Sequence, residues 1–263
     1  MEKILLELMF ITCVIHLIDT LAYSVRLNSV RSGQFALSMS LFNVFVLVSR
    51  TANMLQGPLI GVLIGSSIAG GSDPIGIMRN VIFASTLGTI IGIVFIPTFL
   101  RIFSVAVSRL ESTGSVPSLV IAALSLDNLR RIRAKAAVPR KQMLYNVRFR
   151  EIPKRLLLFN TLITGIYTIG VLAAFYAATL VPADKQLAVV ASSGIINGVA
   201  SILLTMFVDP KAAVITDQAL RGDRPDSDVK ALVVLLIGTK LLGTILAQAL
   251  LIPAAYIIAS FYR

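Results

Sequence analysis

The stretch FALSMSLFNVFVLVSRTANMLQG, residues 35–57, decides the class of this protein. It is long and apolar enough to cross a bilayer as a helix, which takes about 20 residues. Yet it carries Arg50, with Ser49, Asn53 and Gln56 close by in the sequence. In a soluble protein a lone arginine simply extends its charged end into water. The meaning of Arg50 therefore depends on whether the rest of the chain also belongs in a membrane.

Composition indicates that it does. Of the 263 residues, 56% are hydrophobic and 14% are charged, whereas a soluble domain carries about 25% charged residues. Long apolar runs recur along the sequence, without the alternating segments of about ten residues that a β-barrel needs. The single cysteine, Cys13, leaves no intrachain disulfide. The sequence thus predicts an all-α polytopic membrane protein.

Six transmembrane helices fit the pattern of apolar runs. We predict them at residues 4–24, 35–57, 77–104, 156–181, 186–208 and 231–259. The first run lacks a basic n-region and a small-residue cleavage site, so we expect a retained span and not a signal peptide. A further apolar piece at 58–71 is too short to cross, because a helix rises about 1.5 Å per residue. We expect it to form a half-helix, re-entrant or interfacial, that begins at Gly57–Pro58.

The distribution of lysine and arginine predicts the orientation, because basic loops remain in the cytoplasm. The segment 105–155 is the most basic part of the chain, and three predicted spans precede it. The N-terminus and the C-terminus are therefore both expected outside. Because each span crosses the membrane once, counting the spans also places Arg26, Arg31 and the basic 209–230 loop on the cytoplasmic side. The outer side keeps only Lys3, Arg79, Lys185 and Arg263.

The net charge of +11 comes mostly from this orientation bias. The basic segment has no nucleic-acid fold signature and no interleaved aromatic platform, so we expect no nucleic-acid partner. Anionic membrane lipids are expected partners, because each basic residue near their headgroups contributes about 1 kcal/mol. The apolar stretch Leu119–Leu126, before RRIR, is predicted to form an amphipathic surface helix. Whether the chain forms a homo-oligomer stays open.

The two halves of the sequence resemble each other. When residue 162 is aligned with residue 10, Pro58 falls on Pro210. Further on, LGTIIGIVFIP at 87–97 resembles LGTILAQALLIP at 242–253. The alternative is that these are two ordinary hydrophobic hairpins with chance matches.

Because three is an odd number of spans, the second repeat unit starts on the opposite side of the membrane and is inverted relative to the first. We therefore expect an inverted 3+3 repeat with short half-helices, in which residues 1–104 and 156–263 are the units and 105–155 is a basic cytoplasmic linker. Such repeats recur among secondary transporters, with the substrate site near the midplane between the units. Asp209 and Pro210 are predicted as N-cap and first residue of a short helix at 211–221, and helix N-termini suit anions.

Polar residues inside the predicted spans mark the candidate site. An arginine at the bilayer centre costs about 2.5–3.5 kcal/mol on insertion scales, so it normally faces a partner or a cavity. The first two spans each carry a polar stripe with helical spacing, and the last span carries an isolated lysine. The candidates for substrate binding are Arg50, Asn43, Asn53, Gln56, Asp19, His16, Tyr23, Arg26 and Lys240.

Arg50 allows two interpretations. It either forms a buried ion pair with Asp19 that only fixes helix packing, or lines a hydrophilic cavity that binds an anion. In both cases Asp19 is the expected counter-charge. His16 is either a proton carrier or a structural hydrogen-bonding residue. No cluster of His, Cys, Asp or Glu has ligand spacing, so we expect neither a metal nor a cofactor.

The stretch IHLIDTLAYSVRLNSVRSGQFALSMSLFNVFVLVSRTANMLQGPLIG, from Ile15 to Gly61, strongly resembles the Amj family, the alternate lipid II flippases of bacterial cell-wall synthesis. The similarity extends over the whole chain, including TDQALRGDRP in the last loop. It implies a multi-pass protein of the bacterial cytoplasmic membrane. It also implies a substrate, lipid II, which is an undecaprenyl-diphosphate-linked muropeptide moved from the inner to the outer leaflet. The resemblance brings no catalytic motif with it.

Two other functions compete with transport. One is an intramembrane enzyme acting on polyprenyl diphosphates, but Asp19, Glu7 and His16 do not form the acidic cluster or the nucleophile–base pair that such an enzyme needs. The other is a non-transporting scaffold for cell-wall enzymes. The chain has no G-x-x-x-x-G-K-[ST] motif, so ATP hydrolysis is not expected to drive it. We therefore expect a transporter and not an enzyme.

Overall fold

The computed structural model of the protein describes residues 1–115, 137, 139, 147 and 149–262. Six helices in this part of the chain are long and apolar enough to span a membrane, which confirms the six predicted spans and the all-α class. Of the shorter elements, η4 is a π-helix. The predicted surface helix at 119–126 lies outside the described residues. The elements are α1 (Glu2–Ser32), α2 (Phe35–Ala69), α3 (Ile75–Thr113), η2 (Phe149–Glu151), α6 (Lys154–Ala178), η3 (Ala183–Lys185), α7 (Gln186–Leu203), η4 (Leu204–Val208), α8 (Asp209–Leu220) and α9 (Asp226–Ser260).

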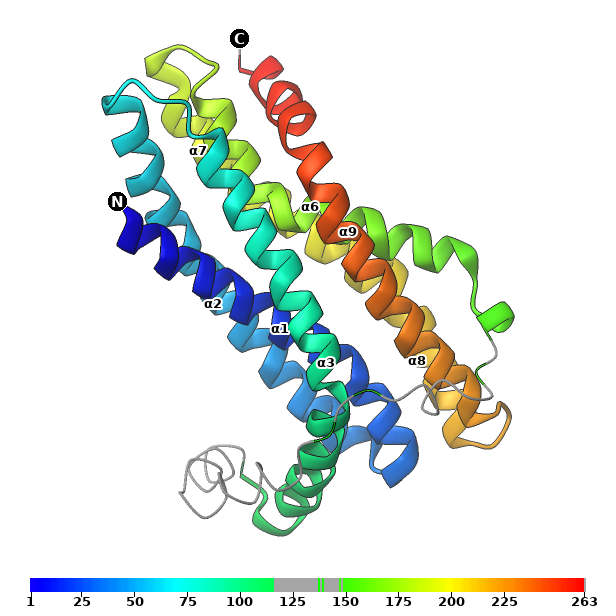
Figure 1. Cartoon of the computed structure of the whole chain (residues 1–263). Helices are drawn as coiled ribbons and strands as arrows, with labels where there is room; N and C mark the ends of the chain where they lie inside the picture. Colours follow the sequence, from blue (N-terminus) through cyan, green and yellow to red (C-terminus); the bar gives the residue numbers. More distant parts are fainter. Residues whose placement is uncertain (116–136, 138, 140–146, 148, 263) are drawn as a thin grey trace.

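The helices form one elongated bundle built from two sets of three. α1 packs against α2 and α3, and α6 packs against α7 and α9. α9 also contacts α3 and α1, which joins the two sets. Both chain termini lie at one end of the bundle, with the turns that follow α2 and α6 (Figure 1). We call this the terminal end. The opposite end holds the turns that follow α1 and α8, and we call it the basic end (Figure 1).

Two glycines bring neighbouring helices into close contact. A Cβ atom on Gly88 of α3 would lie 2.1 Å from the carbonyl oxygen of Cys13 in α1. A Cβ atom on Gly243 of α9 would lie 2.7 Å from the carbonyl oxygen of Thr161 in α6. Neither position accepts a side chain without movement of a backbone. Both glycines stand at the same place in the two LGTI segments, so each half uses this segment for a close helix crossing.

The predicted half-helix at 58–71 is wrong, because α2 continues through Pro58 to Ala69. Proline inside a helix removes one backbone hydrogen bond. A break at this point would leave several backbone groups without partners in the membrane, so the continuous helix costs less. Ile60 and Leu63, just beyond the proline, are buried in the core and support the continuation.

The predicted N-cap role of Asp209 is also wrong. The short helix exists as α8, but α7 passes into it through η4 without a loop. The N-cap of α8 is Val208, which makes no side-chain cap hydrogen bond, and Asp209 is already the first helical residue. Pro210 therefore stands within the first turn, where its missing N–H is tolerated.

The largest apolar core lies between the two sets of helices at the terminal end. Nearer the basic end, buried polar side chains such as His16, Arg26 and Lys240 lie between smaller apolar clusters, one of which joins α1 to α9. These polar side chains line a cavity between the two sets of helices. Buried residues of the apolar core include Leu8, Ile60, Leu63, Ile64, Met78, Ile82, Ile169, Leu172, Ala177, Val189, Ala247 and Leu251.

Candidate substrate cavity

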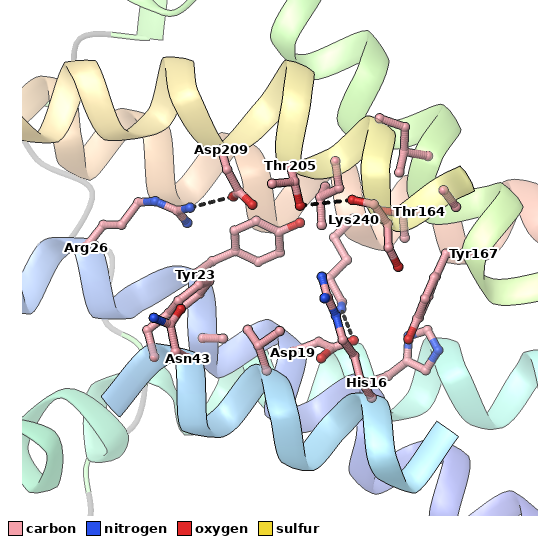
Figure 2. A pocket seen from close by; sticks show the side chains of 18 residues that line it. His16, Asp19, Tyr23, Arg26, Asn43, Thr164, Tyr167, Thr205, Asp209 and Lys240 are labelled. Atoms are coloured by element: carbon pink, nitrogen blue, oxygen red, sulfur yellow. Dashed lines mark hydrogen bonds and ion pairs between the residues drawn. The ribbon is translucent and has the colours of Figure 1, made fainter. Parts of the chain in front are cut away.

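A cavity of about 280 Å³ lies between the two sets of helices. Side chains of α1, α2, α6, α7, η4, α8 and α9 line it, and Figure 2 shows how the labelled ones converge. All the candidates predicted from the sequence are among the lining residues except Asn53 and Gln56. The polar and charged lining residues are His16, Asp19, Tyr23, Arg26, Asn43, Arg50, Thr164, Tyr167, Ser201, Thr205, Asp209 and Lys240.

The polar stripe of α1 forms one wall of the cavity. His16, Asp19, Tyr23 and Arg26 recur at intervals of three or four residues, so they lie on one face of the helix. Arg26 lies at one end of the cavity and His16 at the other (Figure 2). The ring nitrogen Nδ1 of His16 is buried and has no hydrogen-bond partner among the described residues. The stripe therefore presents charged and polar side chains to the cavity.

Asp19 forms an ion pair with Lys240 of α9. The Lys240 Nζ atom lies 3.4 Å from Asp19 Oδ2, and Lys240 is only 4% exposed. The predicted Asp19–Arg50 ion pair is therefore wrong. The reason is that α9 runs beside α1 and inserts a buried ammonium group, which needs a carboxylate more than the exposed Arg50 does.

Arg26 and Asp209 form the second ion pair of the cavity. The Arg26 Nη2 atom donates a hydrogen bond to Asp209 Oδ1 at 2.8 Å. The guanidinium group also lies over the ring of Phe42, 5.3 Å from its centroid. Arg26 is 3% exposed, and its Nη1 atom has no hydrogen-bond partner among the described residues. This pair connects α1 to α8 and so joins the two sets of helices.

Arg50 lines the cavity from α2 without such a pair. Within the described part of the chain, it makes neither a hydrogen bond nor an ion pair. Asn43 lies seven residues earlier, two helical turns away, and faces the cavity too. With Asp19 and Asp209 engaged elsewhere, Arg50 is the cationic side chain of the lining that is available to an anion.

Two predicted candidates lie outside the lining. Gln56 is buried, and its Nε2 atom donates a hydrogen bond to Thr12 Oγ1 at 2.9 Å. It shares a face of α2 with the buried Ser49 and Ile60, next to the face that carries Arg50. Asn53 stands on the Arg50 face but one turn beyond the cavity. The structure thus uses Gln56 to join α2 to α1.

α6 supplies polar residues that the sequence analysis missed. Asn160 is fully buried, accepts a hydrogen bond from the Tyr23 hydroxyl at 2.8 Å, and donates one to the Leu236 carbonyl oxygen at 2.9 Å. Thr164 and Tyr167 follow on the same face and line the cavity. Their spacing of four and three residues in an apolar helix was a detectable signal, equivalent to the stripe on α1.

The lining suits an anion better than a metal ion. Three or more His, Cys, Asp or Glu side chains do not gather anywhere in the described residues. The two carboxylates are occupied by Lys240 and Arg26. What remains for a ligand is the Arg50 guanidinium group and several hydroxyl groups. Guanidinium groups bind phosphate oxygens in a bidentate way.

Comparison with known proteins identifies the family. The family model Amj, described as "Alternate to MurJ", matches residues 11–262. A protein of Bacillus subtilis (strain 168) named "Lipid II flippase Amj" is 42% identical over 267 aligned residues, which cover 98% of each chain. No solved structure gives a match. Because both matches extend over nearly the whole sequence, this chain belongs to the Amj family.

Proposed function

We propose that this protein is a lipid II flippase and that the cavity binds the diphosphate of lipid II. The nearly full-length relative with this name supports the activity. The six apolar helices and this relative support a multi-pass protein of the plasma membrane. The single observation that carries the assignment of the site is that Arg50 lines the cavity without an ion-pair partner among the described residues.

The chemistry of lipid II requires such a group. A diphosphate cannot cross hydrocarbon bare, because an unpaired charge in a low-dielectric medium is very costly. A cationic cavity that admits water shields the diphosphate while the polyprenyl tail stays in the lipid. Arginine suits this role because its planar fork matches two phosphate oxygens. Asn43 and Thr205, also in the lining, add hydrogen-bonding groups.

The two ion pairs leave the cavity with a surplus of positive charge. Lys240 is balanced by Asp19, and Arg26 by Asp209. Arg50 is then the surplus cation. Lys240 and Arg26 can bind a second phosphate when their ion pairs open. Substrate binding is proposed to weaken both pairs, because a diphosphate competes with the carboxylates for the same cations.

We further propose that the basic end faces the cytoplasm and that both termini lie outside. Arg31, Arg109 and Arg221 at the basic end support this orientation, since lysine and arginine remain inside. The apolar core at the terminal end then separates the cavity from the outer surface. Lipid II is thus proposed to enter from the inner leaflet, through the basic end.

An inverted repeat is proposed to explain how the outer side opens. The matching packing of α1 with α3 and of α6 with α9, and the glycines at equivalent places in LGTI, support it. In such transporters the two units rock against each other around a fixed site. Residues 1–104 and 156–263 would be the units, joined by the basic segment at 105–155.

The test is translocation by purified protein in proteoliposomes. Lipid II with a fluorescent headgroup label is incorporated in both leaflets, and an impermeant quencher reports how fast the inner-leaflet pool becomes accessible. A flippase should make the whole pool accessible, whereas protein-free vesicles should protect about half of it. Phosphate release from undecaprenyl diphosphate, measured in parallel, should stay at background. Phosphate release without translocation would instead support the competing intramembrane enzyme.

A further inference from the structure

A second cavity lies beside the central one, toward the basic end. It has a volume of about 290 Å³, and its wall includes Met39 near the start of α2 and Ala213 in α8. Some side chains face both cavities and therefore form the partition between them. These shared residues are Arg26, Phe42, Asn43 and Asp209.

The polar contact that holds this partition closed is the Arg26–Asp209 ion pair. It connects α1 of the first set to α8 of the second, with a donor–acceptor distance of 2.8 Å. Phe42 covers the guanidinium group from α2. The Arg26 side chain is 3% exposed and the Asp209 side chain 33%, so the pair is shielded from water and salt on the arginine side and reachable on the carboxylate side. A competing anion or the loss of one partner would break it.

Neither cavity alone holds the headgroup of lipid II. Pockets for drug-sized ligands measure about 300–1,000 Å³, and a muropeptide with its diphosphate is larger than a typical drug. A cavity of about 280 Å³ accepts a diphosphate but not the attached sugar and peptide. The central cavity can be enlarged from the basic end by joining it with the second cavity. The Arg26–Asp209 pair is the polar contact that separates the two cavities.

A π-helical turn lies directly beside this pair. The π-helix η4 ends at Val208, and Asp209 is the next residue. π-helical turns are rare and are often found at functional sites. Thr205, inside η4, lines the central cavity. A change in η4 would therefore move Asp209 and α8 relative to α7, with which α8 shares an apolar core.

We propose that the Arg26–Asp209 ion pair is a latch between the two cavities, and that Asp209 selects for diphosphate-bearing lipids. The carboxylate of Asp209 holds Arg26 until phosphate oxygens take its place on the guanidinium group. α8 then swings away at η4, and the two cavities merge. This inference rests on the proposed function for the identity of the ligand, but the latch itself is a property of the fold.

The test measures the distance between the two sets of helices at the basic end. Spin labels are attached to cysteines at Ser32 and Asp223, in a variant that carries Cys13→Ser, and the protein is placed in lipid nanodiscs. Both positions are exposed: Ser32 is the last residue of α1, and Asp223 lies in the turn that follows α8. Double electron–electron resonance then gives the distance distribution. A matched pair at Ser32 and Ser112 stays within the first set, where Gln34 is hydrogen-bonded to Glu111.

Two changes should open the latch. Asp209→Asn should shift the Ser32–Asp223 distances to longer values and leave the Ser32–Ser112 distances unchanged. Undecaprenyl diphosphate should do the same to the protein with an intact pair, whereas undecaprenol, which lacks the phosphates, should not. The diphosphate should have no effect on Arg26→Gln. If Asp209→Asn does not fold, Arg26→Gln with Asp209→Asn removes both charges together and should give the same widening.

The outcomes separate the latch from the proposed function. Unchanged Ser32–Asp223 distances in Asp209→Asn and in the double variant would overturn the latch. Widening in Asp209→Asn with equal responses to undecaprenol and undecaprenyl diphosphate would overturn the selection for diphosphate. An intact protein that widens with diphosphate but does not translocate lipid II would support the latch and contradict only the flippase assignment.

Discussion

The ammonium group of Lys240 lies 3.4 Å from the carboxylate of Asp19, and this contact ties the last helix of the chain to the first. The lysine is buried beside the ring of Tyr23, with Nζ 5.9 Å from the ring centroid. Because Asp19 is engaged there, it does not neutralise Arg50. The pair therefore determines both how the two sets of helices are joined and which cation remains for the substrate.

Removing one member of this pair should destabilise the protein. Lys240→Met leaves the Asp19 carboxylate without its partner, and a broken buried pair typically costs about 3–5 kcal/mol. Asp19→Asn with Lys240→Gln removes both charges and should restore most of the loss. Thermal unfolding of the purified variants in detergent measures this. The matched control is Lys3→Met, since the Lys3–Glu7 pair is exposed and should contribute little. Equal melting temperatures for Lys240→Met and Lys3→Met would contradict a structural role for the pair.

Substitution of Arg50 should weaken diphosphate binding and leave stability unchanged. A hydrogen bond to a charged group contributes about 1.5–3 kcal/mol, which corresponds to about 10- to 100-fold in affinity. Arg50→Ala should lose this much in the binding of undecaprenyl diphosphate to detergent-solubilised protein. Arg50→Lys should recover little of it, because the lysine ammonium group lacks the planar fork. If the lysine variant binds as tightly as the unaltered protein, bidentate binding is the wrong description.

The close helix crossing at Gly88 should not accept a larger residue. Gly88→Ala places a methyl group against the Cys13 carbonyl oxygen, so the helices must separate, and overpacking typically costs about 1–3 kcal/mol. Gly76→Ala, on the same helix, has no neighbour within 4 Å and should be neutral or slightly stabilising. The amount of folded protein in membranes, measured by size-exclusion chromatography after solubilisation, distinguishes the two. A similar yield for both variants would contradict the crossing.

The orientation is open to direct labelling. Cysteines at Asp223 and Ala183, each in a Cys13→Ser background, lie in exposed turns at opposite ends of the bundle. In intact cells an impermeant thiol reagent should label Ala183→Cys and not Asp223→Cys. Inside-out vesicles should give the reverse. Labelling of Asp223→Cys in intact cells would mean that the basic end faces outward, against the lysine and arginine bias.

The sequence predicted the spans well because the bilayer imposes a simple rule on length and hydropathy. It did not reveal that α2 continues through Pro58. A proline usually indicates the end of a helix, whereas here the cost of unpaired backbone groups in lipid favours a continuous helix. The stripe from His16 to Arg26 was visible because its spacing is a property of a single helix. The partner of Asp19 was not, because Lys240 lies far away in the sequence and no single-helix pattern connects them. The contact of Arg26 with Asp209 was missed for the same reason.

Translocation by the Arg50→Ala variant tests most directly whether this protein moves lipid II by way of Arg50. The measurement is the rate at which labelled lipid II in the inner leaflet becomes accessible to an impermeant quencher, normalised to the amount of reconstituted protein. We expect rapid translocation by the unaltered protein and a rate near that of protein-free vesicles for Arg50→Ala, with the variant folded to the same extent. Full translocation by Arg50→Ala would mean that transport does not depend on Arg50.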